Sequence, residues 1–185
     1  MKFSLPAALV AVFLLAGLPA YAEDIKLGAD FGPEGWGYRI DYPVDWTKVE
    51  PSNYAVVFSG RQGTAAYHTT VSIQNVRTPE TKDKIAAVMG ELARLEGRIR
   101  DETTGLEVLT RNPFVYEKRG IKVTGAQMVA EFAKRGDAFR QWIVILPRTK
   151  APILHVWIFT GPLEDFPQAL PTAKAMLDSF EIRGE

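Results

Sequence analysis

Two histidines and no cysteine restrict the metal chemistry open to this chain of 185 residues. His68 stands in an expected strand next to Thr69, and His155 shares an expected strand face with Trp157. Zinc sites usually take three or four nitrogen or sulfur ligands, and no segment has the oxygen-ligand spacing of a calcium loop. We therefore expect no metal or other cofactor, with His68 solvated and His155 a core residue bonded to one partner.

The residue types used in nucleophilic catalysis are also sparse. No Gly-x-Ser-x-Gly elbow and no cysteine nucleophile are present. The serines after residue 22 are Ser52, Ser59, Ser72 and Ser179. Carboxylates that could face a cleft include Glu107, Glu131 and Asp137, but their spacing defines no acid–base pair. The sequence therefore favours a protein that is not an enzyme, and a hydrolase with a hidden site is the weakest alternative.

Two short motifs have simpler structural interpretations than functional ones. The glycine-rich stretch GADFGPEGWG at residues 28–37 has neither the dinucleotide-binding nor the P-loop spacing. Arg135-Gly136-Asp137 matches a cell-adhesion tripeptide, but Gly-Asp is ordinary turn chemistry in a hairpin. We expect a flexible arm over residues 23–36 and a turn at residues 134–137.

The remaining chemistry lies in surfaces that could bind a partner. Aromatic side chains next to arginine are favoured at protein interfaces, and Trp36, Tyr38 and Arg39 form such a group beside the expected arm. The alternative, that Trp36 packs back on the sheet edge, stays open. A second candidate is a small basic patch of Lys118 and Arg119 with Lys122, for which a solvated turn is the competing interpretation.

The first 22 residues have the pattern of a secretory signal peptide. Lys2 gives a positive start, residues 5–18 are an apolar run too short to span a bilayer, and Ala20-Tyr21-Ala22 fits the cleavage rule. We expect cleavage before Glu23 and a periplasmic or secreted protein. Loss of Lys2 leaves a net charge of −1, which argues against a nucleic-acid partner.

The elements expected after the arm form one domain over residues 37–185. Alternation and apolar runs predict strands at 38–42, 54–60, 67–76, 106–110, 114–116, 121–124, 142–146 and 153–159, with further hairpin strands around the turn at 134–137. Asn112-Pro113 marks a turn, and residues 117–120 are typical of a hairpin tip.

Two amphipathic helices are expected to cover this sheet. The first spans about 80–98, with Thr78 as cap and apolar residues at helical spacing from Ile85 to Ile99. The second follows Gly161-Pro162 and is kinked or divided by Pro167 and Pro171, and residues 180–183 return as a short edge strand. Strands 142–146 and 153–159 are apolar on both faces, so the sheet needs two covers. The expected fold class is α+β, with an antiparallel sheet sandwiched between helices.

The start and end of this domain resemble those of PsbP-like domains. YRIDYPVDWTKVEPS at residues 38–52 is similar to their Y-x-I-x-Y-P-x-D-W opening, and MLDSFEI at 176–182 is similar to their ending. The resemblance covers nearly all of residues 36–183 and rests on structural motifs. It implies an α-β-α sandwich and a non-catalytic role in binding, assembly or stabilisation.

Two functions of different classes follow. The first is a periplasmic or secreted binding or assembly factor that acts, as a monomer, on a protein partner in the envelope. The second is a small-ligand carrier with a pocket between sheet and helix. A pocket lined with aromatic and convergent polar groups would favour the carrier, whereas a shallow exposed patch would favour the protein-binding factor.

Overall fold

The computed structural model describes residues 25–79 and 83–184. Its strands are β1 (Leu27–Phe31), β2 (Tyr38–Pro43), β3 (Thr47–Ser52), β4 (Ala55–Ser59), β5 (Thr70–Arg77), β6 (Thr104–Lys118), β7 (Ile121–Lys134), β8 (Asp137–Pro147), β9 (Ile153–Pro162) and β10 (Glu181–Ile182). Its helices are α1 (Lys84–Glu102), α2 (Phe166–Ser179) and a short 3₁₀ helix (Ala65–His68). The expected signal peptide lies outside the described residues.

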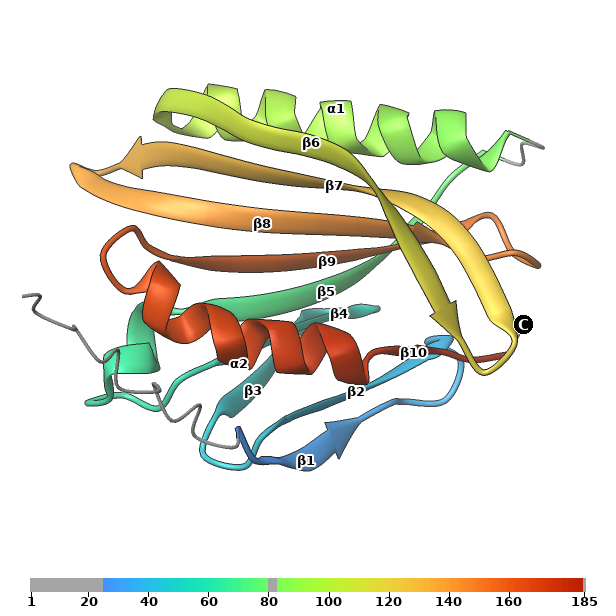
Figure 1. Cartoon of the computed structure of the whole chain (residues 1–185), viewed down its shortest axis with the longest axis horizontal. Coiled ribbons are helices and arrows are strands. Elements are labelled where there is room, and N and C mark those ends of the chain that lie inside the picture. The colour runs from blue at the N-terminus through green and yellow to red at the C-terminus, as the bar shows by residue number, and fades with distance from the viewer. Residues whose placement is uncertain (1–24, 80–82, 185) are drawn as a thin grey trace, which may run out of the picture.

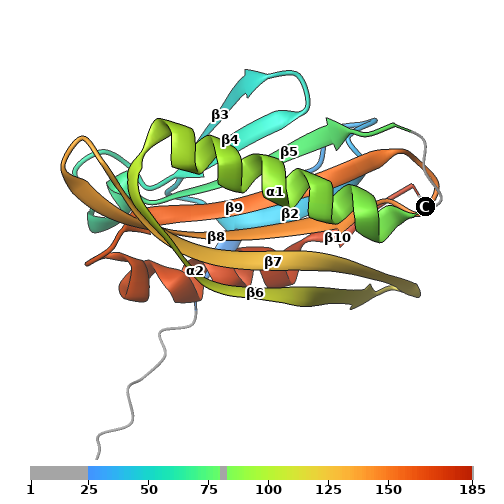
Figure 2. The same ribbon diagram turned by 90° about the horizontal axis from the view of Figure 1, so that it is seen from above.

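The strands form two antiparallel sheets, and the larger is covered on both faces. Seven strands follow the order β3-β4-β5-β9-β8-β7-β6, and a small sheet has the order β1-β2-β10. Helix α1 lies on one face of the large sheet, while α2 and the small sheet lie on the other (Figures 1 and 2). This arrangement confirms the predicted α+β sandwich.

Two-sided burial of the central strands explains why both covers are needed. On β8, Ile143 and Ile145 belong to the cluster under α1, whereas Val144 belongs to the cluster under α2. On β9, Val156 packs toward α1 and Trp157 toward α2. The alternation follows from the two-residue period of a strand. None of the described helices combines the length and apolar character needed to cross a bilayer.

Helix α1 begins later than the sequence predicts. Its cap is Asp83, whose carboxylate accepts a hydrogen bond from the backbone amide of Ala86 at 2.9 Å. Thr78 lies before the helix, and residues 80–82 are outside the described part. Of the apolar residues in the stripe, Leu92 is 1% exposed, whereas Ile85 is 47% exposed.

The loose arm predicted over residues 23–36 is wrong for residues 27–31. These form β1, which pairs with β2 so that Phe31 lies opposite Ile40, and Phe31 is buried in the core. The alternation of buried and exposed positions in β1 is short, and glycine at position 28 weakens its strand signal.

The turn predicted at Asn112-Pro113 is also wrong, because β6 continues through it. Asn112 lies opposite Gln127 and Pro113 opposite Ala126. Strand β6 is at the edge of the sheet, where a proline is tolerated since a missing N–H on the outer side costs no ladder bond. The hairpin turns at 117–120 and 134–137 and the short strand β10 are confirmed.

The second helix is one continuous element, not two. Pro167 lies in the first turn of α2 and Pro171 lies inside it. Because Pro171 has no amide hydrogen, one backbone hydrogen bond is missing near the start of the helix, and the remaining turns can form normally. Its inward side chains include Ala173, Met176 and Leu177, all buried.

Candidate binding groove

The predicted aromatic anchor at residues 36–39 is not one exposed surface. Tyr38 is 1% exposed, and its ring stacks on Phe180 with centroids 5.2 Å apart. Expecting Tyr38 at the surface was wrong, because it points inward from the middle strand of the small sheet. Trp36 is half-buried with its ring 5.3 Å from that of Phe31, in line with the alternative that it packs on the sheet, and Arg39 pairs with Asp41 at 2.9 Å. A partner-binding role for Trp36 and Arg39 stays a prediction.

Burial of Tyr38 has a measurable consequence at alkaline pH. Burial, with a smaller contribution from the charge of Glu50, raises the pKa of its phenol well above the ordinary value of 10. The unfolded chain ionises near pH 10 while the folded chain keeps the proton, so folded-state stability is intact below pH 10 and falls above it. Among the described residues, the hydroxyl has no hydrogen-bond partner.

Tyr38→Phe should therefore flatten the alkaline loss of stability. Between pH 8 and pH 11 we expect the wild type to lose about 1 kcal/mol more free energy of unfolding than the variant. At pH 8 the variant should be at least as stable as the wild type, since the buried hydroxyl that it lacks has no hydrogen-bond partner among the described residues. Urea unfolding at the two pH values measures both differences; equal losses in the two proteins would mean that the phenol ionises in the folded state.

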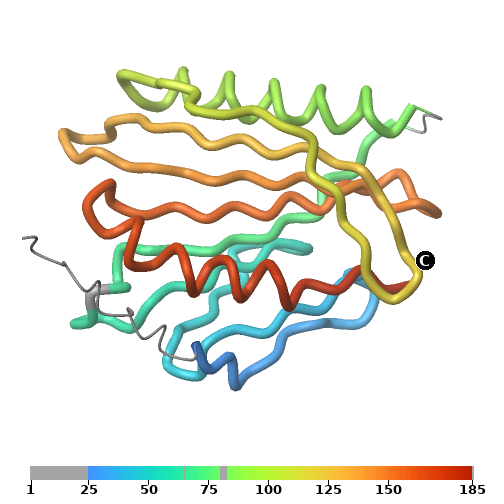
Figure 3. Tube along the Cα trace, in the orientation of Figure 1, coloured from blue at the N-terminus to red at the C-terminus, as the bar shows by residue number. Residues whose placement is uncertain are grey.

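The predicted basic patch at the β6–β7 hairpin tip contacts the end of the chain. Lys118 donates through Nζ to the backbone carbonyls of Asp178 and Phe180, the latter at 3.2 Å, and Arg119 pairs with Glu181 at 3.0 Å. Burial lowers the pKa of Lys118. A cation at the C-terminal carbonyls of α2 is favoured by the helix dipole. Figure 3 shows the tip reaching the C-terminal end of the chain.

The two histidines lie in different environments of the fold. His155 is buried, and its Nδ1 lies 2.6 Å from Asn75 Oδ1 in a hydrogen bond, which confirms the core interpretation. His68 is exposed but ends the short 3₁₀ helix, so its placement in a strand was wrong. Within residues 25–79 and 83–184, no three histidine or acidic side chains could hold a metal ion.

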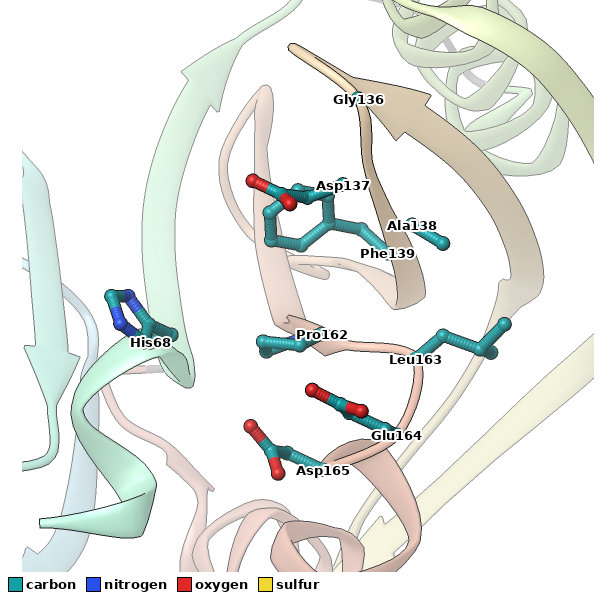
Figure 4. A pocket seen from close by; sticks show the side chains of 9 residues that line it. All are labelled: His68, Gly136, Asp137, Ala138, Phe139, Pro162, Leu163, Glu164 and Asp165. Atoms are coloured by element: carbon teal, nitrogen blue, oxygen red, sulfur yellow. The ribbon is translucent and has the colours of Figure 1, made fainter.

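A cleft of about 600 Å³ lies where the β7–β8 turn approaches the start of α2. Its ionisable side chains are His68, Asp137, Glu164 and Asp165 (Figure 4). His68 stands on one wall, Asp137 on another, and the remaining two lie on the loop that leads into α2. Among the described residues, no hydrogen bond or ion pair joins any two of these four side chains.

A second hollow, of about 430 Å³, lies between α2 and the uncovered part of β6–β8. We call it the α2 groove, and its lining is Leu109, Thr110, Gln127, Val129, Arg140, Trp142, Phe166, Leu170 and Lys174. Helix α2 packs mainly on β2 and β9. The α2-side residues of β7 and β8, such as Val129 opposite Trp142, are therefore left partly open.

The polar groups of the α2 groove differ in whether they already have partners. Trp142 donates through Nε1 to Gln127 Oε1 at 3.1 Å. Arg140 donates through Nε to Glu131 at 2.8 Å and lies over the ring of Phe166 at 5.3 Å. Lys174 is exposed, and none of the described residues forms an ion pair or hydrogen bond with it.

The sequence did not single out this groove. Trp142 fits the pattern of a strand buried on both faces, and Leu170 fits the apolar stripe of a helix. No pattern in the sequence pointed to the groove, because the two expected helices already matched the two apolar faces of the sheet. Of the acidic candidates, Glu107 and Glu131 lie opposite each other on β6 and β7, and Glu131 also pairs with Arg140. Asp137 lies apart from them, in the cleft beside the β7–β8 turn.

The fold is shared with several solved structures of low sequence identity. Cyanobacterial PsbP from Synechocystis sp. PCC 6803 matches with a TM-score of 0.62 and 13% identity, over 83% of this chain and 91% of that one. The Ran-binding protein Mog1p of Saccharomyces cerevisiae has 0.55 and 14%, over 83% and 94%. LpqN of Mycobacterium tuberculosis, described as involved in cell envelope biogenesis, has 0.53 and 14%, over 86% and 87%.

No family model matches the sequence, and no curated protein matches it in a sequence comparison. At these identities the structural similarity shows the fold alone. It confirms the PsbP-like α-β-α sandwich implied by the opening and closing motifs.

Proposed function

We propose that this protein is a non-catalytic binding or assembly factor that acts outside the cytoplasm on a protein partner, through the α2 groove. The groove carries the proposal, because it combines an open apolar surface with groups that have no partner among the described residues. Open apolar patches rimmed by polar groups are typical of protein interaction sites. The neighbours include a Ran-binding protein and a protein of cell envelope biogenesis, which fits a binding or assembly role.

The proposed location and oligomeric state rest on separate observations. The signal-peptide pattern in the sequence of residues 1–22 supports a periplasmic or secreted protein with an envelope partner. At the β3 edge of the large sheet, Lys48, Glu50 and Pro51 stand on a fully exposed strand. Charges and proline on an edge strand oppose edge-to-edge pairing of sheets, which supports a monomer.

A small-ligand carrier is the second candidate, and the same groove favours it. Its volume falls within the range of about 300–1,000 Å³ found for ligand pockets. Aromatic and polar side chains both line it, as a carrier requires. A binding factor would hold a protein in the groove, whereas a carrier would hold a molecule of much smaller mass.

Photocrosslinking in the native envelope separates these candidates. The probe p-benzoylphenylalanine replaces Leu109, which is 41% exposed at the groove, or Val49, which is 59% exposed at the opposite sheet edge. We expect a discrete protein adduct from position 109 and none from position 49. The adduct should disappear in Leu170→Glu, with a thermal melt to confirm that this variant folds.

Two results would overturn the protein-binding proposal. An identical adduct from positions 49 and 109 would mean contact without a specific site. An adduct from position 109 with only the mass of a small molecule or lipid would favour the carrier.

A further inference from the structure

One end of the α2 groove presents hydrogen-bond donors that have no partner among the described residues. Gln127 accepts from Trp142 through Oε1, which orients its amide and leaves the Nε2 donor without a partner in that part of the chain. Lys174 Nζ is likewise without a partner there. Together these groups match the acceptors of a carboxylate.

The other end of the groove carries no uncompensated positive charge. Arg140 is paired with Glu131, and Glu107 lies directly across from Glu131 on β6. Because Lys174 is two turns further along α2 than Phe166, which contacts Arg140, the positive charge is concentrated at the Lys174 end. A ligand with one negative charge would therefore be oriented along the groove.

The middle of the groove is apolar, with Val129 and Trp142 on the sheet and Leu170 on the helix. Leu109 extends this surface to β6, which is the last strand of the large sheet and has no described strand beside its outer edge. An extended segment can thus lie along the groove with apolar side chains against this surface and its ends in solvent.

We propose that the α2 groove selects an extended peptide segment of the partner in which an Asp or Glu side chain lies next to apolar residues. The carboxylate binds Lys174 and Gln127, and the apolar side chains pack on Trp142 and Leu170. This inference rests on the proposed function and specifies the chemistry of its partner. Peptide is the chosen occupant because the groove is open along the free β6 edge and has its uncompensated positive charge at one end only.

The test is a selection of random twelve-residue display peptides on the purified protein. Wild type should enrich peptides with Asp or Glu beside apolar residues, and Lys174→Glu should enrich Lys or Arg at that place. For the best wild-type peptide, fluorescence polarisation should show about a three- to tenfold weaker affinity when its acidic residue becomes Asn or Gln. Lys26→Glu, at an exposed lysine outside the groove, is the matched control and should leave the affinity unchanged.

Several outcomes would overturn the inference. Enrichment indifferent to Lys174→Glu would exclude the charge recognition. Peptides that still bind Leu170→Glu would place their site elsewhere. Displacement of the peptide by dodecanoate but not by unlabelled peptide would assign the groove to an anionic amphiphile.

The inference and the proposed function fail in different ways. If the envelope adduct from position 109 persists in Lys174→Glu but disappears in Leu170→Glu, the groove binds a protein without carboxylate recognition. If no protein adduct forms from position 109 at all, the proposed function itself is wrong.

Discussion

Replacing Leu92 with alanine should lower the free energy of unfolding by about 2–5 kcal/mol. Leu92 is 1% exposed in the middle of α1 and belongs to the cluster that packs on β7, β8 and β9. Its loss removes transfer free energy and leaves a cavity that the close-packed sheet cannot fill. Equilibrium unfolding in urea at neutral pH measures the change.

Ile85 provides a matched control on the same helix. It was counted in the same apolar stripe, yet it is 47% exposed. Ile85→Ala should cost less than about 1 kcal/mol, since little buried area is lost. Similar costs for the two variants would mean that the buried face of α1 is wrongly assigned.

This contrast shows what a helical pattern can and cannot specify. The spacing from Ile85 to Ile99 predicted an amphipathic helix and most of its buried side. The start of the helix depends on whether Thr78 or Asp83 caps it, and both are acceptable cap residues. In the folded chain the Ala86 amide donates a hydrogen bond to the Asp83 carboxylate, so Asp83 is the cap. The spacing of the apolar residues does not show which of the two residues is the cap.

The errors at the N-terminus have a different origin. Residues 27–31 lie within a stretch, 23–36, that is rich in glycine and charged side chains, so the local pattern indicates an arm. They become a strand because β2 lies beside them and because Phe31 fills space near Phe58, with ring centroids 5.8 Å apart. Such pairing is set by tertiary packing, which overrides local propensity. The same effect moves Tyr38 from the expected surface to the core.

The α2 groove could not be predicted for a related reason. Its apolar walls come from Leu109, Trp142 and Leu170, which are far apart in sequence. Each fits the pattern of an ordinary core residue in its own element. What makes them a surface is the position of α2 over β9 and β2, which leaves β6–β8 partly uncovered. Only the relative placement of layers creates that space.

Gly125→Ala should cost about 3 kcal/mol, the upper part of the usual range for overpacking. The added methyl group would collide with the backbone carbonyl of Ile145 on β8, and a backbone atom cannot move aside as a flexible side chain can. The β7–β8 ladder begins at Ala126, opposite Ile145, so Gly125 lies where β7 leaves β8. Beyond this point the β6–β7 hairpin bends toward the C-terminal end of the chain (Figure 3).

Because of that position, the substitution should also loosen contacts far along the chain. The hairpin carries Tyr116, whose hydroxyl accepts a hydrogen bond from the Ile182 amide at 3.0 Å. Hydrogen exchange at Ile182 should therefore accelerate in Gly125→Ala by more than at Val88 in α1, which does not depend on the bend.

Gly90→Ala is the control, since Gly90 lies inside α1 with open space around it. It should stabilise the protein by about 1 kcal/mol through helix propensity. A Gly125→Ala protein as stable as wild type would show that β7 and β8 can separate there without cost, and the bend would then not depend on glycine.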